Sequence, residues 1–251
     1  MNPTVQSVSA FFPCYNDAES IGRMVDTVHD ALVRCEVEYD VTVVNDGSSD
    51  NSGEVLAAME TTRPWLHVVT HSPNRGYGGA LKSGFAAASK QWVFYTDGDA
   101  QYDPSELELL VKHAAADIDV VQGYKTIGGG KRGRNDAWHR KVVGRVYHHF
   151  VRMLFGLKIR DVDCDFRLIR RSLLADITLV NSSGVICLEL VRKLQDAGAR
   201  FVEVPVNHYE RPHGRSQFFR PRRIIISLFD MAVLWLQVVV GPALRRLLKT
   251  N

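Results

Sequence analysis

The sequence has little cysteine and no sign of export. Its 251 residues include four cysteines without a CxxC pair, so neither a zinc site nor a disulfide framework is predicted. The first residues, MNPTVQSVSAFF, lack the basic start and the long apolar stretch of a signal peptide. The protein is therefore expected to act in the reducing cytoplasm.

Motifs of several large protein classes are also missing. The basic segments contain no zinc-finger, RRM or helix-turn-helix pattern, so nucleic acid is not an expected partner. The segment Asn74–Gly84 comes near a P-loop, but Leu81 stands where a Walker A motif needs glycine before Lys82-Ser83, which argues against an NTPase. No GxGxxG fingerprint follows the first expected strand, which argues against a dinucleotide-dependent oxidoreductase.

Long apolar runs are scarce as well. The run Ile224 to Val240 has about 17 residues and contains Asp230 and Gln237, which puts it at the short edge of what spans a bilayer. It predicts a helix that lies in the plane of a membrane surface or packs on protein. The net charge is only +3, but Lys and Arg concentrate in residues 131–152 and 211–223, and these two patches predict anionic partners.

Short apolar runs alternate with helical patterns through the first half of the chain. This alternation predicts an α/β fold with a mostly parallel sheet covered by helices on both faces. In such sheets, ligands bind beyond the carboxyl ends of the strands. The expected strands are Val8–Phe12, Asp40–Val44, Leu66–Thr70, Trp92–Tyr95 and Val120–Gly123. The expected helices between them are Ser20–Cys35, Ser52–Glu60, Gly78–Ala88 and Pro104–Ala115. Later in the chain, Val142–Phe155 is expected to be helical and Ile177–Gln195 to mix strand, turn and helix.

The sharpest chemical signal follows the fourth expected strand, in Asp97-Gly98-Asp99-Ala100-Gln101. Alternate residues of an extended chain point to the same side, so Asp97, Asp99 and Gln101 are expected to face one cation. Oxygen ligands of this kind suit Mg²⁺ or Mn²⁺. The alternative is a solvated acidic turn. The polar segments after the first two strands, 13–20 and 45–52, are in the same way either ligand contacts or ordinary turns and helix caps.

Taken together, the segments that follow the strands resemble glycosyltransferase family 2, which has the GT-A fold. Two later segments resemble its dolichyl-phosphate mannose synthase and polyprenyl-phosphate glycosyltransferase branch. The resemblance covers about residues 7 to 223 and implies a GT-A domain at 1–217, followed by a C-terminal helical segment at 218–251 that associates with a membrane. The motifs that carry it are, in order, Phe12–Ser20, Asp46-Gly47-Ser48, Asn74–Gly84, Asp97–Gln101, Asp161–Arg171 and Val204–Gln217.

The resemblance implies a metal-dependent, inverting hexosyltransferase. It would move a sugar from a GDP-mannose or UDP-glucose type of donor to a polyprenyl or dolichyl phosphate, as a peripheral protein at the cytoplasmic face of a membrane. Mg²⁺ or Mn²⁺ would offset the charge that grows on the leaving nucleotide. By this similarity the catalytic residues are Asp99, Asp165 and Arg167; the metal ligands are Asp97, Asp99 and Gln101; the nucleotide-sugar is held by Pro13, Tyr15, Asn16, Glu19, Asp46, Gly76, Lys82, Asp97 and Gly98; and the acceptor phosphate by Lys125, Arg140, Arg167, Arg211 and Ser216.

Three departures from the family pattern involve four positions. Cys164-Asp165 stands where Ser-Gly or Gly-Gly is usual, and Gln217 and Gly144 replace a lysine and a serine. The replacements at Gln217 and Gly144 remove two groups expected to bind the acceptor phosphate, and Arg215 and Arg220 can compensate for their loss.

Two alternatives stay open. The added charge of Asp165 favours a hydroxyl acceptor, for which Asp163 or Asp165 would serve as the base. A catalytically silent GT-A scaffold is the other. The sequence leaves the donor's base and sugar, the lipid length and the oligomeric state open.

Overall fold

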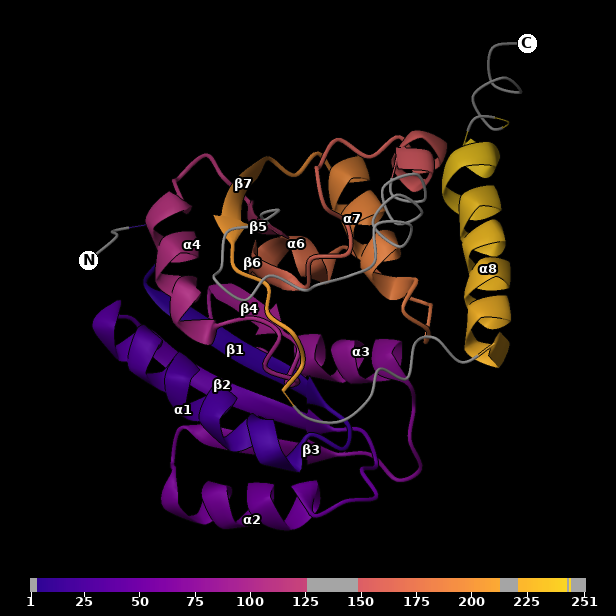
Figure 1. The fold of residues 1–251 in the computed structure, drawn as a ribbon. Coiled ribbons are helices and arrows are strands. Elements are labelled where there is room, and N and C mark those ends of the chain that lie inside the picture. Colours follow the sequence, from indigo (N-terminus) through magenta and orange to yellow (C-terminus); the bar gives the residue numbers. More distant parts are fainter. Residues whose placement is uncertain (1–3, 126–148, 213–220, 243, 245–251) are drawn as a thin grey trace.

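The protein is built around a twisted seven-stranded sheet with the strand order β3-β2-β1-β4-β6-β5-β7 (Figure 1). The computed structural model describes residues 4–125, 149–212, 221–242 and 244, with backbone alone at 221–223. Neighbouring strands pair in parallel, except that β6 runs antiparallel to β4 and β5. The mostly parallel α/β sheet is thus confirmed. The strands are β1 (Ser7–Cys14), β2 (Glu38–Asn45), β3 (Leu66–Thr70), β4 (Trp92–Thr96), β5 (Val120–Lys125), β6 (Phe166–Arg170) and β7 (Phe201–Val206).

Helices cover both faces of the sheet, as the alternation of patterns predicts (Figure 1). One face carries α1 (Ala18–Arg34), α2 (Ser52–Thr62), the short 3-10 helix η1 (Pro104–Glu106) and α4 (Leu107–His113). The other carries α3 (Tyr77–Ala87), α6 (Arg171–Ala175) and α7 (Ile186–Asp196). The chain between α6 and α7 is irregular, so the strand expected within Ile177–Gln195 is wrong.

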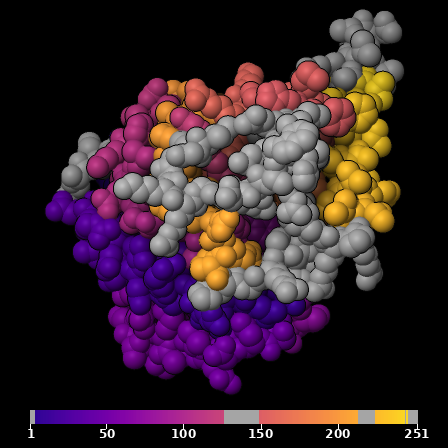
Figure 2. All heavy atoms as spheres, in the orientation of Figure 1, coloured from indigo at the N-terminus to yellow at the C-terminus, as the bar shows by residue number. Residues whose placement is uncertain are grey.

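A last helix, α8 (Pro221–Trp235), continues into the π-helical turn η2 (Leu236–Val240) and forms an outer edge of the molecule, yellow in Figure 2. Met231 and Leu234 pack on a satellite core that includes the helical residues 149–155, and Trp235 Nε1 donates to the Leu154 carbonyl at 3.0 Å. The opposite side of α8 is exposed and apolar. The expected helix is confirmed, and one of its sides packs on the protein; among the described residues, no helix combines the length and the apolar character needed to cross a membrane.

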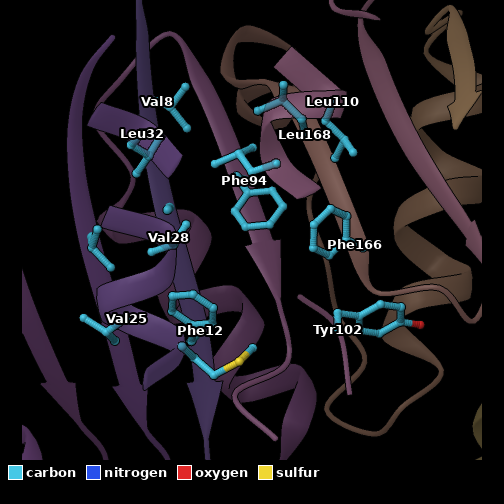
Figure 3. Close-up of a cluster of buried hydrophobic side chains, with 14 of the residues drawn as sticks. Val8, Phe12, Val25, Val28, Leu32, Phe94, Tyr102, Leu110, Phe166 and Leu168 are labelled. Carbon is cyan, nitrogen blue, oxygen red and sulfur yellow. The ribbon is translucent and has the colours of Figure 1, made fainter. Parts of the chain in front are cut away.

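The central strands bury side chains on both faces. In β1, Phe12 points toward α1, whose Val25 and Val28 lie opposite it in Figure 3, while Phe11 points the other way and stacks on Tyr95 of β4 at 5.4 Å between ring centroids. Full burial of such a side chain contributes about 2–3 kcal/mol relative to its exposure. A shift of one residue in register would exchange the two faces, so this packing fixes where β1 ends.

The reversed strand β6 decides the composition of the site. It lies between β4 and β5, with Phe166 opposite Thr96 and Arg167 opposite Tyr95. Because β6 is antiparallel, its amino end meets the carboxyl end of β4. The residues just before and within β6, Asp165 and Arg167, are thereby brought to the sheet edge where ligands of parallel sheets bind.

Candidate active site

The segments that follow β1, β2 and β4 lie together at one edge of the sheet. The Gly98 backbone N–H, just beyond β4, donates to the Pro13 carbonyl at 3.3 Å, and the Asp46 N–H, just beyond β2, donates to the Cys14 carbonyl at 2.9 Å. A side chain on Gly98 would come within 3.0 Å of that same Pro13 carbonyl oxygen. The prediction that these strand ends form one edge is therefore confirmed.

The loop after β1 is tied to the loop after β2 through Asn16. Its side-chain oxygen accepts hydrogen bonds from the N–H groups of Ser49 and Asp50 at 2.7 and 3.3 Å, and its own N–H donates to Ser48 Oγ at 3.0 Å. The amide oxygen of Asn16 is thus used within the protein. Nearby, the Tyr15 N–H donates to Asp17 Oδ2 at 3.2 Å, and Glu19 is exposed in the first turn of α1.

Asp46 is buried and firmly held at the end of β2. Its Oδ1 accepts from the His71 ring Nδ1 at 2.6 Å and from the Arg75 N–H at 2.8 Å. Its backbone carbonyl accepts from Asn74 Nδ2 at 2.6 Å. The carboxylate therefore occupies one position, at the edge where a nucleoside is expected.

The glycine-rich segment before α3 packs closely on the protein's own backbone. Gly76 has a φ of +79°, and a Cβ there would lie 2.8 Å from the Ser182 carbonyl oxygen, while one at Gly78 would lie 2.5 Å from the Asn181 oxygen. Lys82 Nζ donates to the Val180 carbonyl at 3.2 Å. These glycines allow close approach to residues 181–182, and Lys82 is held by the same loop. That Gly76 and Lys82 hold the nucleotide-sugar stays a prediction from the resemblance.

The acidic motif forms a turn. β4 ends at Thr96, and Ala100 adopts a left-handed conformation with φ of 60°, so the extended geometry expected for residues 97–101 is wrong. Asp97 Oδ1 accepts from the Tyr77 hydroxyl at 2.7 Å. Asp99 Oδ1 accepts from the Gln101 N–H at 3.0 Å, and Gln101 Nε2 donates to the Tyr209 carbonyl at 3.2 Å.

Carboxylates outnumber cations in this turn. Burial, together with the negative charges of Asp165 and Asp99, raises the pKa of Asp97 well above its usual range. Burial also raises the pKa of Asp17 to about 6, and Asp99 adds to this shift. Arg211 opposes both effects by pairing with Asp99 and, at 3.8 Å, with Asp17 Oδ1. A further positive charge would stabilise the cluster.

The donor set fits a hard divalent cation held jointly with a diphosphate. Within the described part of the chain, no group of three or more His, Cys, Asp or Glu side chains is arranged to hold a metal ion. Many Mg²⁺ sites nevertheless have only one or two carboxylate ligands from the protein, and phosphates and water supply the other ligands. Asp97 and Asp99, with Gln101 beside them, can supply these protein ligands.

Arg167 is fully buried, with 0% of its side chain exposed, and it holds Asp165 in place. Its Nη1 lies 2.6 Å from Asp165 Oδ1 and also donates to the Tyr95 hydroxyl, while its Nε donates to Gln122 Oε1. Nη2 donates to the Val162 carbonyl. A direct contact between Arg167 and a phosphate therefore requires a change in this arrangement, whereas Asp165 retains some exposed surface.

The predicted acceptor residues are engaged at different places. Lys125 Nζ donates to the Asp163 carbonyl at 3.0 Å and lies 3.6 Å from Asp161 Oδ1, whereas Arg211 pairs with Asp99. Arg140 and Ser216 lie outside the described residues, as do the variant positions Gly144, Arg215, Gln217 and Arg220.

Several side chains of the site were not predicted from sequence. His71 directly follows β3, so the strand-end rule that selected Asp46 can also find it. Asp17 lies within a recognised motif. Tyr77, Tyr95 and Gln122 carry no signal in the sequence, because helix packing and strand register alone bring them to the site.

Comparison with solved structures confirms the GT-A-like fold. Glucosyl-3-phosphoglycerate synthase from Mycobacterium tuberculosis, in complex with Mn²⁺, UDP-glucose and phosphoglyceric acid, superposes with a TM-score of 0.65 at 21% identity, over 90% of this chain and 79% of that one. The same enzyme has also been solved with Mg²⁺ and UDP.

Two curated relatives from bacteria share the sequence pattern. They are the undecaprenyl-phosphate 4-deoxy-4-formamido-L-arabinose transferases of Edwardsiella ictaluri, at 31% identity over 86% of this chain, and of Sodalis glossinidius, at 30% over 85%. The chain spans 64% and 63% of the length of these relatives. The model of the glycosyl transferase family 2 matches residues 9–178, which is more than half of the chain. The fold, the motifs at the strand ends and this match agree: the chain belongs to glycosyl transferase family 2.

Proposed function

We propose that this glycosyltransferase moves a hexose from a nucleotide-diphosphate sugar to the phosphate of a polyprenyl lipid, with inversion and with Mg²⁺ or Mn²⁺. The observation that carries the proposal is the acidic turn of Asp97 and Asp99, placed at the same sheet edge as Asp46. Support for the acceptor comes from the two arabinose transferases, whose names specify undecaprenyl phosphate.

The donor side follows from the strand ends. The loops at 13–19 and Asp46 would hold the nucleoside, and Asp97, Asp99 and Gln101 would hold the cation. When bound, the cation would offset the charge that grows on the leaving diphosphate. Arg211 pairs with Asp99 in the structure, and its forked donors suit a phosphate oxygen once a cation satisfies that carboxylate.

The acceptor determines whether a base is needed. A lipid phosphate is already ionised near neutral pH, so it can attack the anomeric carbon without losing a proton, and a single displacement inverts that centre. Lys125, together with Arg140 and Ser216, would orient this phosphate. Asp165, held by buried Arg167, would complete the wall of the site.

A second candidate is transfer to a hydroxyl group. It is favoured by Asp165, which lies at the site edge, is fixed by Arg167 and raises the pKa of Asp97 through its charge. A fixed, partly exposed carboxylate of this kind is suited to remove a proton from an acceptor hydroxyl. Asp163 suits that role less well, because it is exposed on the loop that Lys125 contacts.

The two functions differ in their acceptor. Purified protein is supplied with a panel of GDP- and UDP-sugars, with Mg²⁺ or Mn²⁺, and with either a polyprenyl phosphate or the corresponding alcohol, and donor consumption is followed. Transfer to the phosphate alone supports the proposal. Asp99→Asn should then abolish turnover, whereas the matched change Asp103→Asn, at a helix cap whose oxygen an amide can replace, should not.

The remaining outcomes are equally informative. Equal transfer to the alcohol, lost in Asp165→Asn, establishes the hydroxyl acceptor. Absence of both turnover and nucleotide binding with every donor refutes the transfer reaction and favours the scaffold.

Contact with the cytoplasmic face of a membrane, through the helical segment at 218–251, is part of the same proposal. The outer side of α8 is apolar, with Ile225 and Phe229 exposed to 68% and 69%, and an apolar helix face of this kind binds the lipid headgroup boundary. Flotation with anionic vesicles tests it. Phe229→Glu should reduce vesicle binding, while Val33→Glu, at an exposed valine of α1, should leave it unchanged. Wild-type protein that does not float with the vesicles refutes this contact.

A further inference from the structure

Three polar side chains, two of them buried, are linked by hydrogen bonds next to the candidate nucleotide site. Asp46 Oδ1 lies 2.6 Å from His71 Nδ1, and His71 Nε2 lies 2.8 Å from Ser83 Oγ. Asp46 directly follows β2, His71 directly follows β3, and Ser83 lies in the middle of α3. His71 and Asp46 are only 2% and 3% exposed.

The chemistry of the three groups sets the direction of the bonds. An ionised carboxylate can only accept, so the proton must lie on Nδ1 of His71, and in the neutral ring Nε2 then accepts from the Ser83 hydroxyl. The order carboxylate, imidazole, hydroxyl is that of a hydrolytic triad. Here, however, the imidazole is buried and Ser83 lies within a helix, so the hydroxyl is placed to support the ring.

The same Asp46 oxygen also accepts the Arg75 backbone N–H at 2.8 Å. Two donors on Oδ1 fix both torsions of the carboxylate, and with them the direction of its second oxygen. An oxygen that can only accept is suited to a ribose hydroxyl or a base N–H. A carboxylate fixed in advance loses less conformational entropy when such a ligand binds.

We propose that His71, supported by Ser83, is a positioning residue that holds the Asp46 carboxylate in the orientation required for the donor nucleotide. The inference rests on the proposed function, in which Asp46 contacts that nucleotide. It assigns His71 to donor binding rather than to the transfer step. The expected signature is therefore a change in the affinity for the nucleotide and in the KM for the donor, with kcat nearly unchanged.

Three variants separate the two hydrogen bonds of His71. His71→Phe fills the space but removes both bonds, and it should raise the Kd for the nucleotide about 10- to 100-fold, the range for a hydrogen bond to a charged group. His71→Asn keeps a donor near the position of Nδ1 but does not reach Ser83. It should match Ser83→Ala, and both should raise the Kd by only about threefold to fivefold.

A matched control is available at the opposite edge of the sheet. Ser89 Oγ donates to Asp40 Oδ2 at 3.0 Å near the start of β2, so Ser89→Ala also removes a bond between a serine and an aspartate, far from the carboxyl end of the strand. This control should leave the Kd for the nucleotide unchanged.

The test is calorimetric titration of each variant with UDP and with GDP in the presence of Mn²⁺ and without acceptor, followed by the KM and kcat for the donor. A normal Kd in His71→Phe, or a fall in kcat at constant KM, overturns the inference. If His71→Phe does not fold, a normal Kd in both His71→Asn and Ser83→Ala overturns it. Wild-type protein that binds no nucleotide refutes the proposed function instead.

Discussion

Arg211→Gln tests whether the acidic turn depends on a positive charge. In the structure Asp99 is only 5% exposed and pairs with Arg211, which also lies 3.8 Å from Asp17. The substitution keeps part of the length and polarity of the side chain but removes its charge. It leaves the carboxylates without the arginine that compensates them.

The size of the effect follows from burial. Loss of one partner of a buried ion pair costs about 3–5 kcal/mol, because the other charge stays buried. Since 27% of the Arg211 side chain is exposed, solvent reduces this to about 2 kcal/mol. With an unfolding entropy of about 2.1 cal/mol/K per residue, a chain of this length should melt about 4 °C lower.

The assay is thermal melting in EDTA and in Mn²⁺. In EDTA the variant should melt below the wild type. Mn²⁺ should raise the Tm of the variant more than that of the wild type, because in the wild type the ion must displace Arg211 from Asp99. Arg34→Gln, which removes a surface pair with Glu108, is the control and should leave the Tm unchanged. An unchanged Tm in EDTA, or equal gains with Mn²⁺, refutes the reasoning.

Three further predictions concern stability. The pKa of Asp17 is about 6 in the folded protein against an ordinary 3.8, so the wild-type free energy of unfolding falls as the pH rises between these values. At pH 7 the variant Asp17→Asn should be up to about 3 kcal/mol more stable than the wild type, and near pH 3 the two should be equally stable. Thermal melting in EDTA at both pH values measures this difference. Gly84→Ala places a Cβ 2.2 Å from the Phe11 ring and should lower the free energy of unfolding in urea by about 2–3 kcal/mol. Gly53→Ala, in α2, places a Cβ 3.5 Å from Asn45 Nδ2 and should raise the free energy of unfolding by about 0.5–1 kcal/mol. Glu189→Gln weakens a buried carboxylate that accepts the N–H groups of residues 180 and 181, so hydrogen exchange of these two amides should accelerate; unchanged exchange would contradict this.

Much of the fold follows from local patterns. Short apolar runs predicted β1 to β5, and helical patterns predicted α1 to α4, because both signals are encoded within a few residues. The boundaries shifted by a few residues, as for β2, which begins at Glu38. The rule that ligands bind beyond the strand ends then selected Asp46 and Asp97, and the structure brings both to one edge.

Strand β6 shows where local patterns stop. Residues 166–170 are short and carry two arginines, so they give little signal of a buried strand. Residues 166–170 form a strand because they pair with β4 and β5, which supply the hydrogen-bond partners for their backbone. The same pairing buries the side chain of Arg167. In the same way, β4 ends at Thr96 and Ala100 is left-handed, so residues 97–101 do not continue that strand as the sequence predicted.

The sequence by itself determined the class of the protein, the order of its elements and the segments that meet at the site, since each depends on motifs or on short-range periodicity. The tertiary structure alone decided which side chains pair. Arg211 reaches Asp99 across 112 positions of chain, and His71 reaches Asp46 from a different strand. Such pairs depend on strand register and side-chain rotamers that form only when distant segments pack, so no local pattern encodes them.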